Sequence, residues 1–390
     1  MLIGRKFTVL GAGIGGLAVA TALAQRGARV TVLEQAEAIR EVGAGLQISP
    51  NGAVVLRALG CGDALEHAGL SGQAVHLRDY QNGKQVACID ISGAQPGYFF
   101  VHRADIVDLL AKAARDAGVK IRLLHKITDV NLKGDHACLT TAQGAKIKSD
   151  MVIGADGLHS VLRGVLNTAA QPKFTGQVAW RSVVPAKGQQ PPVATIYMGP
   201  GRHLVTYPLR GGKFTNIVAV EERDDWVDEG WSQQDDPDNL RRAFQDFSPE
   251  VQTLLSRVET VHLWGLFKHP VAPHWHNHAA AILGDAAHPT LPFMAQGGNM
   301  ALEDAWVLAS SLAQHDTPAA AFAAYQAARR DRCQRIVDAA SKNARNYHLS
   351  FPPLRIAAHT ALSVASKIAP SKLLGRFDWI YGHDVTQLHG

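Results

Sequence analysis

The chain has 390 residues, of which 46% are apolar and 19% charged, and its formal net charge is +5. This composition excludes a disordered chain, and the length allows two domains or one large composite domain that can bury a cofactor. The positive charge is spread without a basic stripe, and no apolar run reaches the ~18 residues of a membrane-spanning helix, so we expect neither a nucleic-acid partner nor a membrane protein.

The first elements predict a nucleotide-binding turn. An apolar run over 7–10 is followed by glycines, a helical pattern over 14–25 and a β-branched run over 30–33. In Gly11-x-Gly13-x-x-Gly16, the first glycine permits a tight turn, the second lets the backbone approach a pyrophosphate, and the third allows close helix packing. Glu34 lies near the spacing expected for an acid that binds a ribose hydroxyl. The pattern predicts dinucleotide binding but does not distinguish FAD from NAD.

The middle of the chain predicts two kinds of sheet. A helical pattern over 104–117 ends at Gly118, and strand-like pieces follow at 121–124, 137–141 and 151–153. Between 174 and 220, strands alternate with glycine-containing turns, which is typical of a separate antiparallel sheet. The pattern then predicts a helix over 236–257, strands over 260–267 and 279–283, and a helix over 298–312. Because the last strand and helix return to the first pattern, we expect a discontinuous nucleotide-binding domain.

Neither the four cysteines nor a histidine-rich segment indicates a metal site. Cys61, Cys88, Cys138 and Cys333 form no CxxC pair, which is typical of a reducing compartment, and we expect a cytoplasmic protein. The histidines at 269, 274, 276 and 278 are interrupted by prolines, which indicates a solvated loop. The stretch 354–374 mixes apolar and basic residues and is compatible with a packed helix or with a peripheral membrane contact.

Two segments resemble the paired DG and GD motifs of class A flavoprotein aromatic hydroxylases. They are Asp150-Met-Val-Ile-Gly-Ala-Asp-Gly-Leu-His-Ser-Val-Leu-Arg163 and Leu283-Gly-Asp-Ala-Ala-His-Pro289. The resemblance implies FAD as cofactor. Asp285 would bind the ribityl hydroxyls of FAD, and Arg103 would contact the same region of the cofactor. The resemblance also implies that Asp156 serves FAD and NAD(P)H handling. Taken alone, Asp285 follows a buried strand, where ligands of α/β sheets bind, which favours a ligand contact over the alternative of a helix cap.

A further segment, Gln296-Gly-Gly-Asn-Met-Ala-Leu-Glu-Asp304, begins a helix. The N–H groups of Gly297, Gly298 and Asn299 could stabilise negative charge on a reduced flavin. The resemblance adds Pro292, whose carbonyl would face the flavin.

The fold class predicted from these features is α/β. It consists of a Rossmann-like FAD-binding domain of the GR2 type, an antiparallel-sheet substrate domain and a C-terminal helical segment. The expected FAD-binding domain is discontinuous, over 1–72, 98–170 and 276–345. The substrate side comprises 73–97 and 171–275, and the helical region 346–390.

On the substrate side, the segments 203–212, 294–297 and 377–382 resemble the salicylate hydroxylase and 3-hydroxybenzoate 6-hydroxylase branch. This implies a small phenolic aromatic acid hydroxylated with NADH or NADPH and O2, through a flavin C4a-hydroperoxide. His203 and Tyr207 share one face of a strand, and a histidine with a pKa of about 6.5 suits removal of the phenol proton. Gln296 and Tyr98 are further pocket candidates. His203 could instead be a hydrogen-bonded sheet residue, Gln296 a helix cap and Tyr98 a packing residue.

Several alternatives remain open from the sequence alone. A flavin monooxygenase could act on a heterocycle of the hydroxynicotinate or urate type, or on a polyketide. An NAD-dependent dehydrogenase would use the same glycine turn but leaves the DG and GD segments unexplained. A flavin-binding regulatory protein would show no turnover. The residues are compatible with a monomer or a homodimer.

Overall fold

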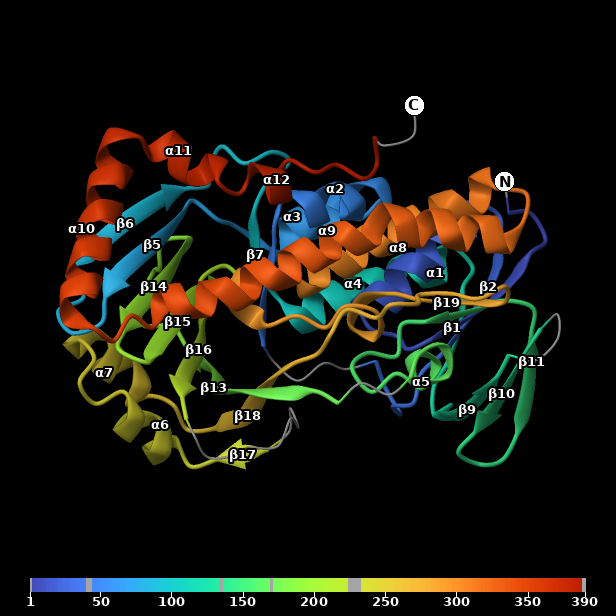
Figure 1. Ribbon diagram of the computed structural model, residues 1–390, viewed down its shortest axis with the longest axis horizontal. Helices are drawn as coiled ribbons and strands as arrows, with labels where there is room; N and C mark the ends of the chain where they lie inside the picture. Colours follow the sequence, from blue (N-terminus) through green and yellow to red (C-terminus); the bar gives the residue numbers. More distant parts are fainter. Residues whose placement is uncertain (1, 40–43, 133–135, 169–170, 224–232, 388–390) are drawn as a thin grey trace.

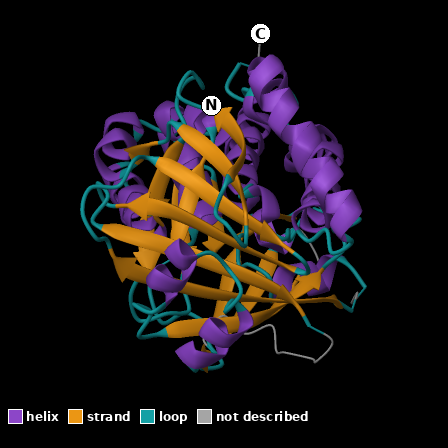
Figure 2. Ribbon diagram, turned by 90° about the vertical axis from the view of Figure 1, so that its left-hand side faces the viewer, coloured by secondary structure: helices purple, strands orange, loops and turns teal. Residues whose placement is uncertain are grey.

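Two sheets of different type organise the chain, and long helices join them (Figure 1). The computed structural model describes residues 2–39, 44–132, 136–168, 171–223 and 233–387. Figure 2 looks at the left-hand side of Figure 1 and shows strands filling the centre with helices around them. Within the described ranges, no helix is long and apolar enough to cross a membrane.

The first sheet is parallel throughout. Its order is β19 (Ala280–Ile282), β12 (Val152–Gly154), β1 (Lys6–Leu10), β2 (Arg29–Leu33) and β8 (Lys120–Arg122). Strands β19, β12 and β1 are short, largely buried apolar runs, as is usual for parallel sheets covered by helices, whereas the edge strand β8 is Lys-Ile-Arg and partly exposed. Gly11, Glu34 and the GD turn all follow the carboxyl ends of these strands, where α/β sheets bind ligands.

The second sheet has eight strands and is antiparallel except where β14 pairs with β5. Its order is β17 (Gln234–Asp235), β18 (Val261–Lys268), β13 (Lys173–Pro185), β16 (Phe214–Glu222), β15 (Arg202–Leu209), β14 (Val193–Gly199), β5 (Ala74–Asp79) and β6 (Gln85–Asp90). Successive side chains point to opposite faces. Trp180 therefore packs with Phe244 on one face, whereas its neighbour Ala179 packs with Phe293 on the other.

Two smaller antiparallel sheets complete the β structure: β3 (Gly45–Ile48), β7 (Phe99–His102) and β4 (Leu70–Ser71); and β11 (Lys146–Ser149), β10 (Ala137–Thr141) and β9 (Ile127–Asn131). Residues 137–141 thus join a separate sheet and not the parallel one. The domain boundaries stay a prediction, and the boundary at 170 falls on residues outside the described ranges.

The helices of the first half are α1 (Ile14–Gln25), α2 (Pro50–Ala58), α3 (Gly62–Ala68), α4 (Arg103–Asp116) and α5 (Val161–Leu166). Later helices are α6 (Pro237–Ala243), α7 (Pro249–Leu255), α8 (Gly297–Gln314), α9 (Pro318–Tyr347), α10 (Pro352–Ile368), α11 (Pro370–Gly375) and α12 (Asp378–Tyr381), with 3-10 turns η1 (Gly284–Ala286) and η2 (Pro292–Met294). The single helix predicted over 236–257 is wrong, because Pro249 starts a second helix as its first residue.

Helix α9 connects the two halves of the molecule (Figure 1). Its 30 residues correspond to a rod of about 45 Å. Pro318 begins the helix, and the Thr317 hydroxyl accepts a hydrogen bond from the Ala320 N–H. Its C-terminal end lies at the large sheet, so residues after Tyr347 reach the neighbourhood of β15.

Replacing Gly16 with Ala should destabilise the fold itself. A Cβ there would overlap the Gly11 carbonyl oxygen and lie 3.3 Å from the Ala155 Cβ. We expect the free energy of unfolding of the cofactor-free protein to fall by ~1–3 kcal/mol, measured by urea denaturation. Gly164→Ala is the matched control, because a Cβ at that helical position meets nothing within 4 Å. Equal stability of the two variants would contradict this packing.

Candidate active site

A cavity of about 660 Å³ is lined by residues that follow strands of the parallel sheet and by residues of the eight-stranded sheet. Gly13, Gly15 and Asp285 come from the parallel-sheet side, and His203 and Tyr207 from the antiparallel sheet. A volume of this size is typical of sites for cofactors and small organic ligands.

The glycine-rich turn is built by close backbone approach. Gly11 has φ +96°, a conformation that L side chains rarely adopt, and its peptide lies against Gly16. The Glu34 carboxylate accepts hydrogen bonds from the N–H groups of Ala12, at 2.7 Å, and Ala36, at 2.9 Å. In contrast, a Cβ at Gly13 would meet no atom within 4 Å. The turn therefore leaves a cradle open beside Gly13, at the start of α1.

The structure brings most of the predicted site residues to this one cavity. Those that line it are Gly13, Arg103, His203, Tyr207, Asp285, Pro292, Gln296, Gly297 and Gly298, together with Tyr98. Those outside the lining are Gly11, Gly16, Glu34, Asp156 and Asn299. Asn299 is fully buried: its side-chain oxygen accepts from the Ser49 N–H, and its amide donates to the Gln47 and Ala295 carbonyls.

The DG segment supports the GD turn. Asp156 accepts a hydrogen bond at 2.9 Å from the N–H of Val161, the first residue of α5, and burial raises the pKa of its carboxyl group. The Arg163 guanidinium donates to the carbonyl oxygens of Ala286, at 3.1 Å, and Pro270, at 2.7 Å. These bonds tie the two segments together behind Asp285.

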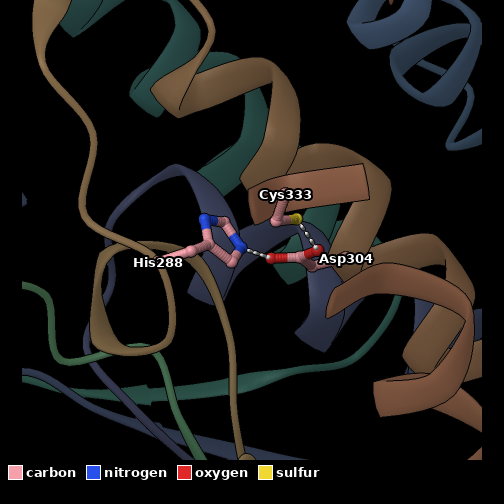
Figure 3. Close-up of side chains that lie close together, drawn as sticks. All are labelled: His288, Asp304 and Cys333. Carbon is pink, nitrogen blue, oxygen red and sulfur yellow. Dashed lines mark hydrogen bonds and ion pairs between the residues drawn. The ribbon is translucent and has the colours of Figure 1, made fainter. Parts of the chain in front are cut away.

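A buried ion-pair network contacts the GD turn, and Figure 3 shows two of its members, His288 and Asp304, with Cys333 beside them. Asp304 of α8 accepts from the Gly284 N–H at 3.0 Å, from His288 Nε2 at 2.5 Å and from Arg329 Nε at 2.8 Å. Burial alone would raise the pKa of Asp304, but His288 and Arg329 lower it to about 2. Conversely, burial alone would lower the pKa of His288, but Asp304 raises it well above its usual value. His288 is thus structural and positively charged.

Among the described residues, His288, Asp304 and Cys333 are the group whose donor atoms lie close enough, within 4.8 Å, to hold a metal ion. However, the Asp304 carboxylate is already bonded to Arg329, Gly284 and His288. The positive charges of Arg329 and His288 oppose a cation there. We therefore interpret the cluster as an ion-pair network.

The network continues from Glu303 to the cavity. Arg332 donates two hydrogen bonds of 2.8 Å to Glu303, and Asn51 donates to both Glu303 and Gln296, at 2.5 and 3.1 Å. Gln296 in turn donates to the Ser49 hydroxyl at 3.0 Å. Asn51 and Ser49 therefore fix the side chain of Gln296 at the border of the cavity.

His203 and Tyr207 lie on the cavity wall contributed by β15. His203 is 2% exposed, and burial together with the nearby His348 holds its pKa well below the usual value. Its Nδ1 lies 2.6 Å from Nε2 of His348. Burial also raises the pKa of Tyr207. Both side chains are therefore uncharged at neutral pH.

Sequence analysis missed the residues that support the site. The adjacent acids Glu303 and Asp304 in an otherwise apolar helix segment were a usable signal, because buried carboxylates need partners. His348 carried no such signal, since it lies 145 residues from His203 along the chain.

The fold and the cavity define a class of protein: a dinucleotide-binding oxidoreductase whose cofactor cradle opens into a mostly apolar substrate pocket. A family model described as "FAD binding domain" matches residues 6–340. The 3-amino-4-hydroxybenzoate 2-monooxygenase PtmB3 of Streptomyces platensis is 32% identical over 98% of this chain and 96% of that protein. The 3-hydroxybenzoate 6-hydroxylase of Klebsiella oxytoca is 32% identical over 96% of each chain. The crystal structure of Klebsiella pneumoniae HpxO with FAD and uric acid has a TM-score of 0.84, 26% identity and 96% coverage of both chains.

The chain belongs to the class A FAD-dependent aromatic hydroxylases. It is a monooxygenase whose cofactor is FAD and whose co-substrates are NADH or NADPH and O2. This confirms the FAD prediction and excludes the NAD-dependent dehydrogenase.

The residues that line the cavity fit FAD. The open cradle at Gly13 leaves room for a pyrophosphate at the N-terminus of α1, whose N–H groups favour negative charge. Asp285 and Arg103 both line the same cavity, and so do Gly297 and Gly298 at the N-terminus of α8. A dinucleotide could therefore contact both helix N-termini.

Replacing Gly13 with Ala should weaken FAD binding while leaving the apoprotein stable. Gly13 has φ −78°, which alanine adopts readily, and the added methyl would enter only the open cradle. We expect flavin retention, measured by absorbance after gel filtration, to drop at least ~10-fold, with urea denaturation of the apoprotein unchanged. Wild-type FAD affinity in this variant would contradict the placement of the pyrophosphate.

Replacing Asp304 with Asn should destabilise the protein, because His288 loses its buried counter-charge and Arg329 keeps only one of its two, Glu303. We expect the free energy of unfolding to fall by ~3–5 kcal/mol in urea denaturation at neutral pH. The folded-state pKa of Asp304 is about 2, below an unfolded value of about 3.9. The stabilisation is therefore present above pH ~4 and lost as the pH falls toward 2, so the difference from wild type should shrink there.

The control for this variant is Asp331→Asn, at an exposed position of α9, which should change stability by less than ~0.5 kcal/mol. An Asp304→Asn protein as stable as this control would show that the buried network contributes nothing.

Proposed function

We propose that the enzyme hydroxylates the ring of a small phenolic aromatic acid of the salicylate or 3-hydroxybenzoate type. The observation that carries this proposal is His203, a neutral histidine on the wall of the cavity that also contains Asp285 and the N-terminus of α8. The names of the relatives support it, since they act on 3-hydroxybenzoate and 3-amino-4-hydroxybenzoate.

The proposed role of His203 is to accept the phenol proton. Loss of that proton makes the ring electron-rich, as an electrophilic oxygen donor requires. Tyr207, kept neutral by burial, can donate or accept a hydrogen bond beside the substrate oxygen. Arg181 and Arg376 also line the cavity, and their positive charge favours a substrate carboxylate.

The cofactor roles are proposed from placement. Asp285 and Arg103 would bind the central part of FAD, and Gly297 and Gly298 would offer N–H groups to the flavin ring, next to Pro292. Gly11, Gly16, Glu34, Asp156 and Asn299 would support these contacts from behind the wall. Bound FAD, once reduced by NADH or NADPH, supplies the chemistry that activates O2.

A heterocyclic substrate is the second candidate. It is favoured by the likeness to HpxO, which was crystallised with uric acid. Such a ring also carries an acidic N–H or O–H group, so we propose that His203 would accept a proton from either substrate.

We further propose that the enzyme works in the cytoplasm, as a monomer or a homodimer. The cysteines Cys61, Cys88, Cys138 and Cys333 are all free thiols, which is typical of a reducing compartment.

The test is a screen of hydroxybenzoates, aminohydroxybenzoates, hydroxypyridines and urate for stimulated NADH or NADPH oxidation, with the hydroxylated product identified. We expect a phenolic acid to give product. His203→Phe should lower product formation by ~100-fold or more while keeping FAD, with the missing product replaced by hydrogen peroxide. Tyr207→Phe, the control variant at the same cavity wall, should lower product formation less than His203→Phe does. Normal turnover by His203→Phe would remove His203 from the mechanism, and product from urate alone would favour the second candidate.

A further inference from the structure

Three side chains form a continuous hydrogen-bonded path from the cavity to the surface. Nδ1 of His203 lies 2.6 Å from Nε2 of His348, and Nδ1 of His348 lies 2.9 Å from a carboxylate oxygen of Glu222. His203 and His348 are 2% and 4% exposed, whereas the Glu222 side chain is 49% exposed. The path therefore begins at a buried residue on the cavity wall and ends in water.

The position of His348 results from helix α9. His348 caps the C-terminus of that helix, and its carbonyl accepts a hydrogen bond from the Gly201 N–H at 3.3 Å, in the turn before β15. The rings of Phe293 and Tyr347 lie 5.5 and 5.2 Å from the His203 ring and enclose it. His203 and His348 are thus held in one arrangement and shielded from water.

The carboxylate determines the tautomers of both histidines. An ionised carboxylate only accepts hydrogen bonds, so Nδ1 of His348 must carry the proton. Nε2 of His348 then has a lone pair and must accept from Nδ1–H of His203. As a result, Nε2 of His203 carries a lone pair, and this is the ring nitrogen available to a ligand in the cavity. The arrangement makes His203 a base without charging it.

Two arginines on strand positions next to this path have partners of their own. On the neighbouring strand positions, Arg202 pairs with Asp246 at 2.9 Å, and Arg223 pairs with Glu221 at 3.0 Å. Burial raises the pKa of Tyr347 to about 12, so this neighbour stays neutral. Glu222 is therefore the group that polarises the two histidines.

His203 is poorly suited to keep a proton that it receives. Burial and the neighbouring His348 lower its pKa well below the usual value, and burial likewise lowers the pKa of His348, against the opposing effect of Glu222. A proton on either ring would be a buried charge, which is costly. Proton removal from the substrate therefore needs a route onward to water.

We propose that Glu222 and His348 are positioning residues that hold His203 as a base and relay the substrate proton to solvent. The inference rests on the proposed function. The phenol O–H bond breaks as Nε2 of His203 takes the proton, the Nδ1 proton of His203 moves to Nε2 of His348, and the Nδ1 proton of His348 moves to Glu222 and then to water. One proton leaves the substrate, one reaches solvent, and no electron moves. Reversal of the path protonates the product oxygen and restores both tautomers.

The first test compares Glu222→Gln with Glu221→Gln, which removes a carboxylate at the adjacent position of β16 without touching the path. Both side chains are accessible enough for the variants to fold. A bound hydroxybenzoate is titrated by its phenolate absorbance, and kcat and KM are measured against pH. In Glu222→Gln, we expect the ligand to ionise at least ~1 pH unit higher than in wild type. We also expect kcat to fall at least ~10-fold at neutral pH and to recover at high pH, with KM nearly unchanged.

Glu221→Gln should follow wild type, and Glu222→Asp should restore part of the loss. If Glu222→Gln has the same pH profile and ligand ionisation as Glu221→Gln, the relay is overturned.

The second test needs no substrate. In the FAD-bound enzyme with ¹⁵N-labelled histidine, NMR should show His203 protonated at Nδ1 and bare at Nε2, and this tautomer should be lost in His348→Phe. A proton on Nε2 of His203 in the wild-type enzyme would overturn the proposal. Failure of the proposed function is seen separately, as a wild-type enzyme that hydroxylates none of the phenolic acids.

Discussion

The buried carboxylate of Asp304 is the constraint on which the site depends. It joins helix α8 to the GD turn through Gly284 and His288, and to α9 through Arg329. Each partner stabilises part of the negative charge of Asp304, which would be costly to bury alone. Helix α8, the GD turn and helix α9 are therefore held in one relative arrangement. Asp285 directly follows Gly284, so the hydrogen bond between Gly284 and Asp304 also positions Asp285. The acidic neighbour Glu303 extends the same constraint to Gln296 through Asn51.

Helix α9 carries this constraint from the cofactor side to the substrate side. Arg329 anchors the helix beside Asp304, and His348 follows its last residue about five turns later, next to His203. A helix is stiff over that length, so the base is positioned relative to the cofactor cradle by the same ion pairs that order the GD turn. The strands of the large sheet then contribute the wall itself, through alternation of side chains between its two faces.

Burial governs the chemistry of the cavity as well as its shape. The same loss of water that lowers the pKa of His203 raises that of Tyr207, so neither group carries charge at neutral pH. Arg103, Arg181, Asp285 and Arg376 bring charge to the cavity lining, whereas the Asp304 network lies behind the wall and Glu222 at the far end of the path through His348. Because His203 itself is only 2% exposed, a proton that it receives needs a directed route to water.

The sequence by itself determined the cofactor-binding half, because its signals are local: glycines at a strand-helix turn, Glu34 after the second strand, and the DG and GD segments. The DG and GD segments also predicted the family and its cofactor, FAD. Resemblance also singled out His203, Tyr207, Pro292 and Gln296, which line one cavity and whose roles stay predictions, and the predicted two-sheet architecture was confirmed. Only the tertiary structure decided which side chains form hydrogen bonds with those residues. The partners of Gln296 lie on α2 and in the turn before it, and that of His203 lies 145 residues away. The tautomer of His203 and the burial of Asp304 depend on contacts between distant segments, and no local pattern encodes them.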